Sequence, residues 1–302
     1  MRIKMENETM NVMEQQEVLT EQPKKKPVKS VVCSLLTLLA FIAIQVTVSG
    51  VGAAAYMVSC ITQNGDDTDA ALQTYLDQIE SSGFMTNLLL ITTLICGIVA
   101  LLWYRFGIVK KYDKSRWAEF KAQLNVKNVA KVAVLAIGCY GVALLLSEII
   151  SIVIPGSMED YSEIMGMALS GSEIAAFITV VILAPVAEEL AFRGIIFRML
   201  EKNCPLVAAI LLQAVLFGVY HMNIMQGIYV LPLAIALGYV AYRTKSVYPC
   251  IFMHMINNFM PTLLSGLPES TPTLPIAAVI IVICAGLLYL LTRGTKTQNV
   301  QC

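Results

Sequence analysis

The sequence predicts an all-α fold, a polytopic integral membrane helical bundle of about eight transmembrane helices. Hydrophobic residues make up 57% of the 302 residues and charged residues only 14%, whereas soluble domains carry about 25% charged residues. The apolar residues also gather into eight runs, each long enough for a membrane-spanning helix of roughly 17–25 residues. The expected spans are residues 31–58, 85–107, 129–154, 174–200, 205–222, 225–243, 247–265 and 273–292.

The charges between these runs support the count of eight. Lys and Arg occur in the links after the second, fourth and sixth runs and in both tails, and the other links have none. Cytoplasmic loops are the ones rich in Lys and Arg. The alternation therefore predicts a multi-pass protein of the cell membrane with both termini in the cytoplasm. The formal net charge of zero argues against a nucleic-acid partner.

Composition divides the chain into four regions. Residues 1–29 are polar and are expected to form a disordered cytoplasmic tail, and residues 30–172 form a three-span N-terminal bundle with its loops. Polar residues inside apolar runs gather after about residue 184, so residues 173–265 are expected to be a functional core of four spans. Residues 266–302 supply the final span and a short cytoplasmic tail. The eight cysteines form no CxxC pair, and we expect them to be reduced and buried.

Two adjacent carboxylates, Glu188 and Glu189, and a nearby Arg193 lie inside the fourth apolar run. An ionisable side chain at membrane depth costs about 2.5–3.5 kcal/mol on insertion scales, so three of them in six residues indicate a function. Glu189 and Arg193 are four residues apart, share a helix face and can form an ion pair. Glu188 is rotated by about 100° and has no partner in its own segment. We therefore predict one structural and one working carboxylate.

Pro185 lies just before this pair of carboxylates. A proline within a helix removes a backbone N–H and leaves a carbonyl without its usual donor. This predicts either a simple kink or a wider cavity at this point of the span.

The only two histidines of the chain, His221 and His254, lie in the same four-span region. Glu188 and His221 are both roughly 22–27 Å from the link near Asn203 at about 1.5 Å per residue, so antiparallel helices bring them level. His254 and Asn258 are four apart and share a helix face. His254 is about 14 Å from the inner end of its span at the same rise, and it can join Glu188 and His221 if the fourth and fifth helices project into the cytosol. The spacing therefore permits a single cluster.

Such a cluster suits acyl hydrolysis, which needs a base to activate water and donors for the developing oxyanion. Glu188 with His221 could hold and deprotonate a water molecule, and His254 with Asn258 could donate to the oxyanion. No serine or cysteine lies among residues 188–193, 217–221 or 254–258, so a covalent nucleophile is not needed. Two histidines and a glutamate (Glu188, His221 and His254) are also a familiar zinc set, although the helical HExxH spacing is absent. A divalent metal such as zinc therefore stays open as a cofactor.

Three short motifs appear in order, each in its own span. They are EExxxR from Glu188 to Arg193, FxxxH from Phe217 to His221, and HxxxN from His254 to Asn258. Together they resemble the CAAX protease and bacteriocin-processing family of intramembrane endopeptidases, also called CPBP or Abi, over roughly residues 174–265.

The resemblance implies an α-helical protease core in which Glu188 activates water and His221 assists. It implies that His254 and Asn258 form the oxyanion site, and that the substrate is a membrane-associated peptide or protein, prenylated and CAAX-like or of bacteriocin type. A glutamate-dependent and a metal-dependent mechanism both remain open.

Two other functions are compatible with the same residues. Buried Glu, His and Arg also build proton relays and ion sites in transporters, but the chain has no inverted repeat and few helix breaks of the transporter kind. A non-catalytic membrane scaffold or immunity protein would keep the packing and tolerate loss of Glu188.

Overall fold

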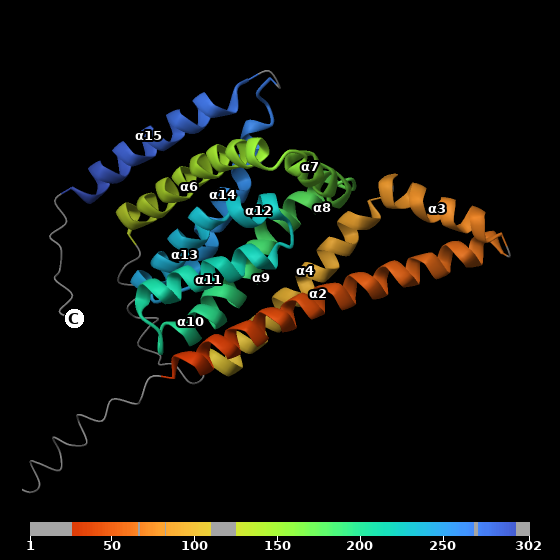
Figure 1. Cartoon of the computed structure of the whole chain (residues 1–302), viewed down its shortest axis with the longest axis horizontal. Coiled ribbons are helices and arrows are strands. Elements are labelled where there is room, and N and C mark those ends of the chain that lie inside the picture. The colour runs from red at the N-terminus through yellow and green to blue at the C-terminus, as the bar shows by residue number, and fades with distance from the viewer. Residues whose placement is uncertain (1–25, 66, 82, 110–124, 269–270, 294–302) are drawn as a thin grey trace, which may run out of the picture.

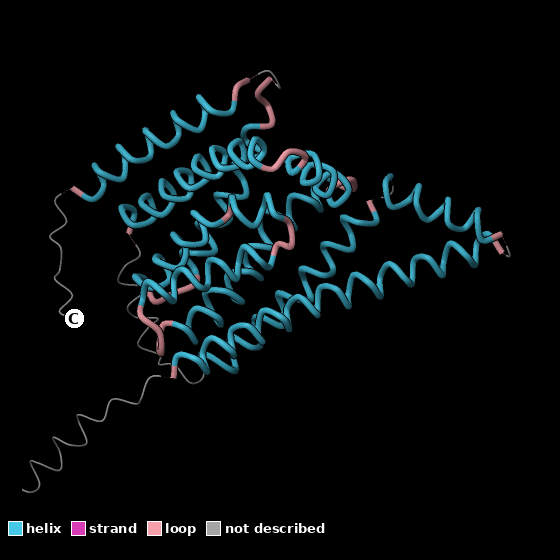
Figure 2. The backbone as a smooth tube through the Cα atoms, in the orientation of Figure 1, coloured by secondary structure: helices cyan, strands magenta, loops and turns pink. Residues whose placement is uncertain are grey.

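The computed structural model describes residues 26–65, 67–81, 83–109, 125–268 and 271–293. Every regular element in these ranges is a helix (Figure 2). In chain order the elements are α2 (Pro27–Asn64), α3 (Thr68–Ser81), α4 (Phe84–Leu102), η1 (Trp103–Val109), α6 (Val126–Val153), α7 (Ser157–Ala168), α8 (Glu173–Phe177), η2 (Ile178–Leu183), α9 (Ala184–Glu189), η3 (Leu190–Ile196), α10 (Phe197–Leu200), α11 (Leu206–Tyr220), α12 (Ile224–Tyr229), α13 (Leu231–Thr244), α14 (Tyr248–Leu264) and α15 (Thr273–Thr292).

The all-α membrane bundle is confirmed, whereas the count of eight spans is not. Five helices are long and apolar enough to cross a membrane, namely Pro27–Asn64, Phe84–Val109, Val126–Val153, Glu173–Leu200 and Thr273–Thr292. The other three expected spans are helical but shorter. Helix α11 has 15 residues, about 22 Å at 1.5 Å per residue, against a hydrocarbon core of about 30 Å. The expected span 225–243 is divided into α12 and α13, and Pro232 lies in the first turn of α13.

Three further expectations differ from the structure or lie outside it. The expected tail 1–29 falls mostly outside the described residues, but Pro27 already begins α2. The first and third links were expected to be loops and instead contain helices α3 and α7. The short, mixed sequences of these two helices carry acidic residues in their first turns, which favour a helix start.

Hydrogen bonds join links and helix ends that are far apart in the sequence, at two opposite ends of the bundle. At one end, the Asn203 side chain donates to Ser30 Oγ at 2.6 Å and accepts from the Lys26 backbone N–H at 3.1 Å. At the other end, Thr86 Oγ1 donates to the Ala168 carbonyl at 3.0 Å. The first link therefore lies beside the third, and the start of α2 lies beside the fourth. The cytoplasmic assignment of the termini stays a prediction.

The run α8–α10 lies in the middle of the molecule together with α11, α13 and α14 (Figure 1). Helices α2 and α4 flank it on one side, and α6 and α15 on the other. In the apolar window of Glu173–Leu200, 39% of the residues are buried inside the protein, against 11% for Thr273–Thr292. The helix that carries the two carboxylates is therefore a core helix, and α15 is peripheral.

Candidate active site

A buried ion pair organises the core. The Arg193 guanidinium donates to Glu189 Oε1 at 2.8 Å, and both side chains are fully buried. Its other terminal nitrogen donates to the Ala234 carbonyl of α13 at 3.2 Å, and its Cζ lies 4.6 Å from the centre of the Phe217 ring. The ion pair predicted from the spacing is therefore present, and it connects the core helix to α11 and α13.

Glu189 also binds His254 of α14. His254 Nδ1 lies 2.9 Å from Glu189 Oε1, and because a carboxylate only accepts, Nδ1 carries the proton. The other ring nitrogen, Nε2, is then directed to the second carboxylate and lies 3.8 Å from Glu188 Oε2. Glu189 thus fixes the ring orientation of His254.

The two adjacent carboxylates differ in exposure and in contacts. The Glu188 side chain is 16% exposed, whereas that of Glu189 is 0% exposed. Glu189 Oε1 accepts from two partners on different helices, and its Oε2 is buried without a hydrogen bond. Glu188 is therefore the carboxylate that a water molecule or a substrate can reach.

His221 is the residue that follows the last turn of α11, and the Phe217 ring lies between the His221 and His254 rings. His221 Nδ1 is 2.8 Å from the Phe217 carbonyl, which only accepts, so the Nε2 of the neutral ring keeps its lone pair. The Phe217 ring packs edge-on against both imidazoles, with centroids 4.8 Å from His221 and 5.8 Å from His254.

Asn258 lies one turn beyond His254 and contacts the core helix. Its Nδ2 donates to the Val180 carbonyl of η2 at 3.0 Å, and its Oδ1 accepts a long hydrogen bond of 3.4 Å from Asn257 Nδ2. One N–H of the amide therefore binds the protein backbone, and the second remains for another acceptor.

The helix that carries the carboxylates is wound unevenly. Helix α9, with Glu188 and Glu189 at its end, lies between two π-helical segments, η2 and η3. Short π-helical turns inside α-helices are frequent at functional sites. The uneven winding here coincides with the residues that the motifs single out.

Two side chains of the buried core, Phe217 and Gln213, have contacts that the sequence did not predict. Phe217 was noted as a motif residue without a role, and it is fully buried between the two histidines. Gln213 is fully buried, and its Nε2 donates to the Ala234 carbonyl that also accepts from Arg193. An amide in the otherwise apolar run of α11 was the signal that could have revealed Gln213.

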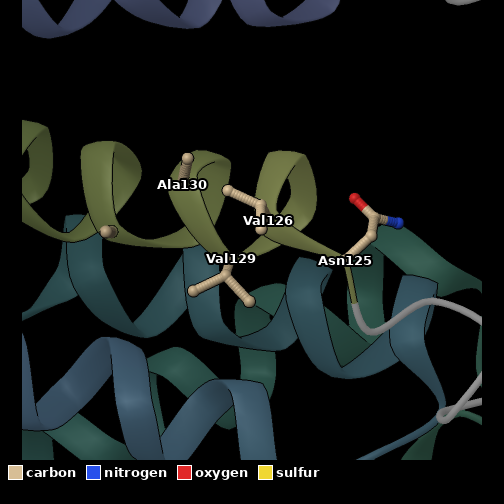
Figure 3. Close-up of a pocket in the computed structure, with 5 residues that line it drawn as sticks. Asn125, Val126, Val129 and Ala130 are labelled. Carbon is tan, nitrogen blue, oxygen red and sulfur yellow. The ribbon is translucent and has the colours of Figure 1, made fainter.

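Two further observations concern ligands. Among the described residues, no three His, Cys, Asp or Glu side chains form a group that could hold a metal ion. A cavity of about 500 Å³ opens at the start of α6 and is lined by Asn125, Val126, Val129, Ala130 and Ala133 (Figure 3). None of the predicted site residues lines it.

The fold and the site define a helical, multi-pass membrane protein with a buried Glu–Arg–His cluster in its core. Residues 170–260 match the family model described as type II CAAX prenyl endopeptidase Rce1-like. The matched segment contains all three motifs, so this part of the chain is similar to the CAAX protease family. Comparisons with curated proteins and with solved structures gave no match.

Proposed function

We propose that this protein is an intramembrane endopeptidase in which Glu188 activates water for attack on a peptide bond. The observation that supports this most strongly is the division of labour between the two carboxylates. Glu189 is occupied by Arg193 and His254, at 2.8 and 2.9 Å. Glu188 is partly accessible and faces His254 Nε2 at 3.8 Å. General-base catalysis requires a base that is held in place and whose oxygens are not already engaged by other hydrogen-bond donors.

The reaction divides into two proton transfers. Glu188, assisted by the Nε2 lone pair of His221, takes a proton from water as its oxygen attacks the carbonyl carbon. The negative charge moves to the carbonyl oxygen, where the remaining N–H of Asn258 donates to it, together with His254 Nε2–H when the ring carries a second proton besides the one on Nδ1. The proton then passes from Glu188 to the leaving nitrogen, the C–N bond breaks, and a carboxylic acid and an amine result. No covalent intermediate with the protein forms.

Two observations support a proposal for the substrate class, namely the family match and the location of the site. The matched family is described as a CAAX prenyl endopeptidase, and the site residues lie on helices of the buried core. We therefore propose a membrane-associated peptide or protein substrate of the prenylated CAAX type. From the alternation of Lys- and Arg-rich links we also propose that both chain termini lie in the cytoplasm.

A peptide cleavage assay tests this function. Purified protein in lipid vesicles is mixed with a fluorogenic, prenylated CAAX-type peptide, and the wild type is compared with Glu188→Ala. We expect cleavage by the wild type and none by Glu188→Ala at equal folded yield. Equal turnover by both would remove the role of Glu188. Comparative proteomics of membranes containing either form then looks for peptides that persist uncut only with Glu188→Ala.

The same assay tests metal dependence. Because the described residues form no three-ligand group, the proposed mechanism uses only Glu, His and Asn side chains. Cleavage should continue at an unchanged rate in the presence of a strong zinc chelator. Loss of cleavage with rescue by added zinc would contradict this mechanism.

A further inference from the structure

The π-helical pattern before Pro185 leaves one backbone carbonyl without its usual N–H donor. In η2, the N–H of Ala184 bonds to the Thr179 carbonyl, five residues back. The next N–H in this π-helical pattern, at position 185, would bond to the Val180 carbonyl. Position 185 is a proline, which has no N–H. The Val180 carbonyl is thus left without a backbone donor.

The donor comes from another helix. Asn258 Nδ2 of α14 lies 3.0 Å from the Val180 carbonyl oxygen. A buried carbonyl without a partner is costly in an apolar setting. The hydrogen bond therefore holds the Asn258 side chain against the Val180 carbonyl. It joins α14 to the core helix one turn after His254 and five residues before Pro185.

The contact also determines how the Asn258 amide points. With one N–H on the Val180 carbonyl and Oδ1 toward Asn257, the nitrogen and oxygen of the amide cannot exchange places. Its second N–H is then held in one direction, as an oxyanion donor requires.

We propose that Pro185 is a positioning residue, which acts by withholding an N–H from the Val180 carbonyl so that Asn258 can dock there. The docking sets the amide of Asn258 and the face of α14 that carries His254 against Glu188 and Glu189. This inference rests on the proposed function, because it gives Asn258 its orientation as an oxyanion donor.

Kinetics test the catalytic part of this proposal. Pro185→Ala restores an N–H that competes for the Val180 carbonyl and loosens Asn258. With the prenylated CAAX-type peptide, kcat per folded molecule should fall roughly tenfold with little change in KM, since a small misplacement of a catalytic group is enough for such a loss. Pro275→Ala, in the first turn of peripheral α15, is the matched control and should leave kcat unchanged. A wild-type kcat for Pro185→Ala overturns the proposal.

A stability cycle tests the docking without any substrate. Asn258→Leu removes the donor and leaves the Val180 carbonyl unpaired, so it should lower the Tm of the purified protein. In the Pro185→Ala background the new N–H can satisfy that carbonyl, so Asn258→Leu should lower the Tm by about half as much or less. In the Pro275→Ala background the full decrease should remain. Equal decreases in all backgrounds overturn the docking, whereas absence of cleavage by the wild type contradicts the proposed function alone.

Discussion

The core helix run Glu173–Leu200 and the peripheral helix α15 are both long and apolar enough to cross a membrane, but their surroundings are very different. Helix α15 buries small residues, Ala277 and Cys284, and lies against α6. The core run buries Glu189, Arg193 and large aromatic side chains. A helix that faces lipid can pack on its neighbour through close approach of small residues. The core is instead held by polar groups that bind one another across helices.

The largest expected effect concerns the ion pair of the core. Arg193→Ala would leave Glu189 buried without its 2.8 Å partner, and breaking a buried pair destabilises by about 3–5 kcal/mol. We expect a large loss of folded protein and a lower Tm. Arg243→Ala, at an exposed site on α13, is the control and should change stability by at most about 0.5 kcal/mol. Normal yield and Tm for Arg193→Ala would contradict the importance of the pair.

A smaller effect is expected at the contact between α6 and α15. A Cβ at Gly141 would lie 2.8 Å from Ile280 Cγ2, so Gly141→Leu forces the helices apart and should destabilise by about 1–3 kcal/mol. Cleavage per folded molecule should stay at the wild-type rate, because α15 contributes nothing to the site.

The matched control for that contact is Gly286→Leu, since a Cβ at Gly286 meets nothing within 4 Å. Its Tm should stay near that of the wild type. A loss of catalytic rate in Gly141→Leu would show that the peripheral helix acts on the site, and the contrast between the two regions would fail.

The smallest effect is expected at Gln213. Its Oε1 is buried without a partner, and the carbonyl to which its Nε2 donates also accepts from Arg193. Gln213→Leu removes the unpaired oxygen together with one of two donors, so stability should change by less than about 1 kcal/mol. A large decrease in Tm would show that Gln213 supports Arg193 more than the shared carbonyl indicates.

The sequence was sufficient for features that depend on local spacing. Hydropathy predicted the membrane bundle, and the four-residue spacing predicted the pair of Glu189 and Arg193. Counting residues along the helices also indicated that Glu188 and the two histidines could lie at the same depth. The division of the sixth run was signalled by Pro232 without being recognised, because a proline in an apolar run is compatible with an unbroken span.

Features that depend on contacts between distant segments could not be predicted. The partner of Asn258 is the Val180 carbonyl, 78 positions away. Pro185 withholds its N–H from that carbonyl only within π-helical winding, which no sequence pattern marked. In the same way, His254 bonds to Glu189 across 65 positions. The predicted oxyanion and water-activating roles of these residues stay proposals.

The central claim is that adjacent carboxylates have separate tasks, and the paired variants Glu188→Gln and Glu189→Gln test it most directly. Turnover per folded molecule and Tm are measured for both. We predict that Glu188→Gln loses about 10²–10⁴-fold in turnover at an unchanged Tm. Glu189→Gln should lower the Tm, because Arg193 and His254 lose their charged partner. Wild-type turnover by Glu188→Gln, or the same change of both quantities in the two variants, would contradict the claim.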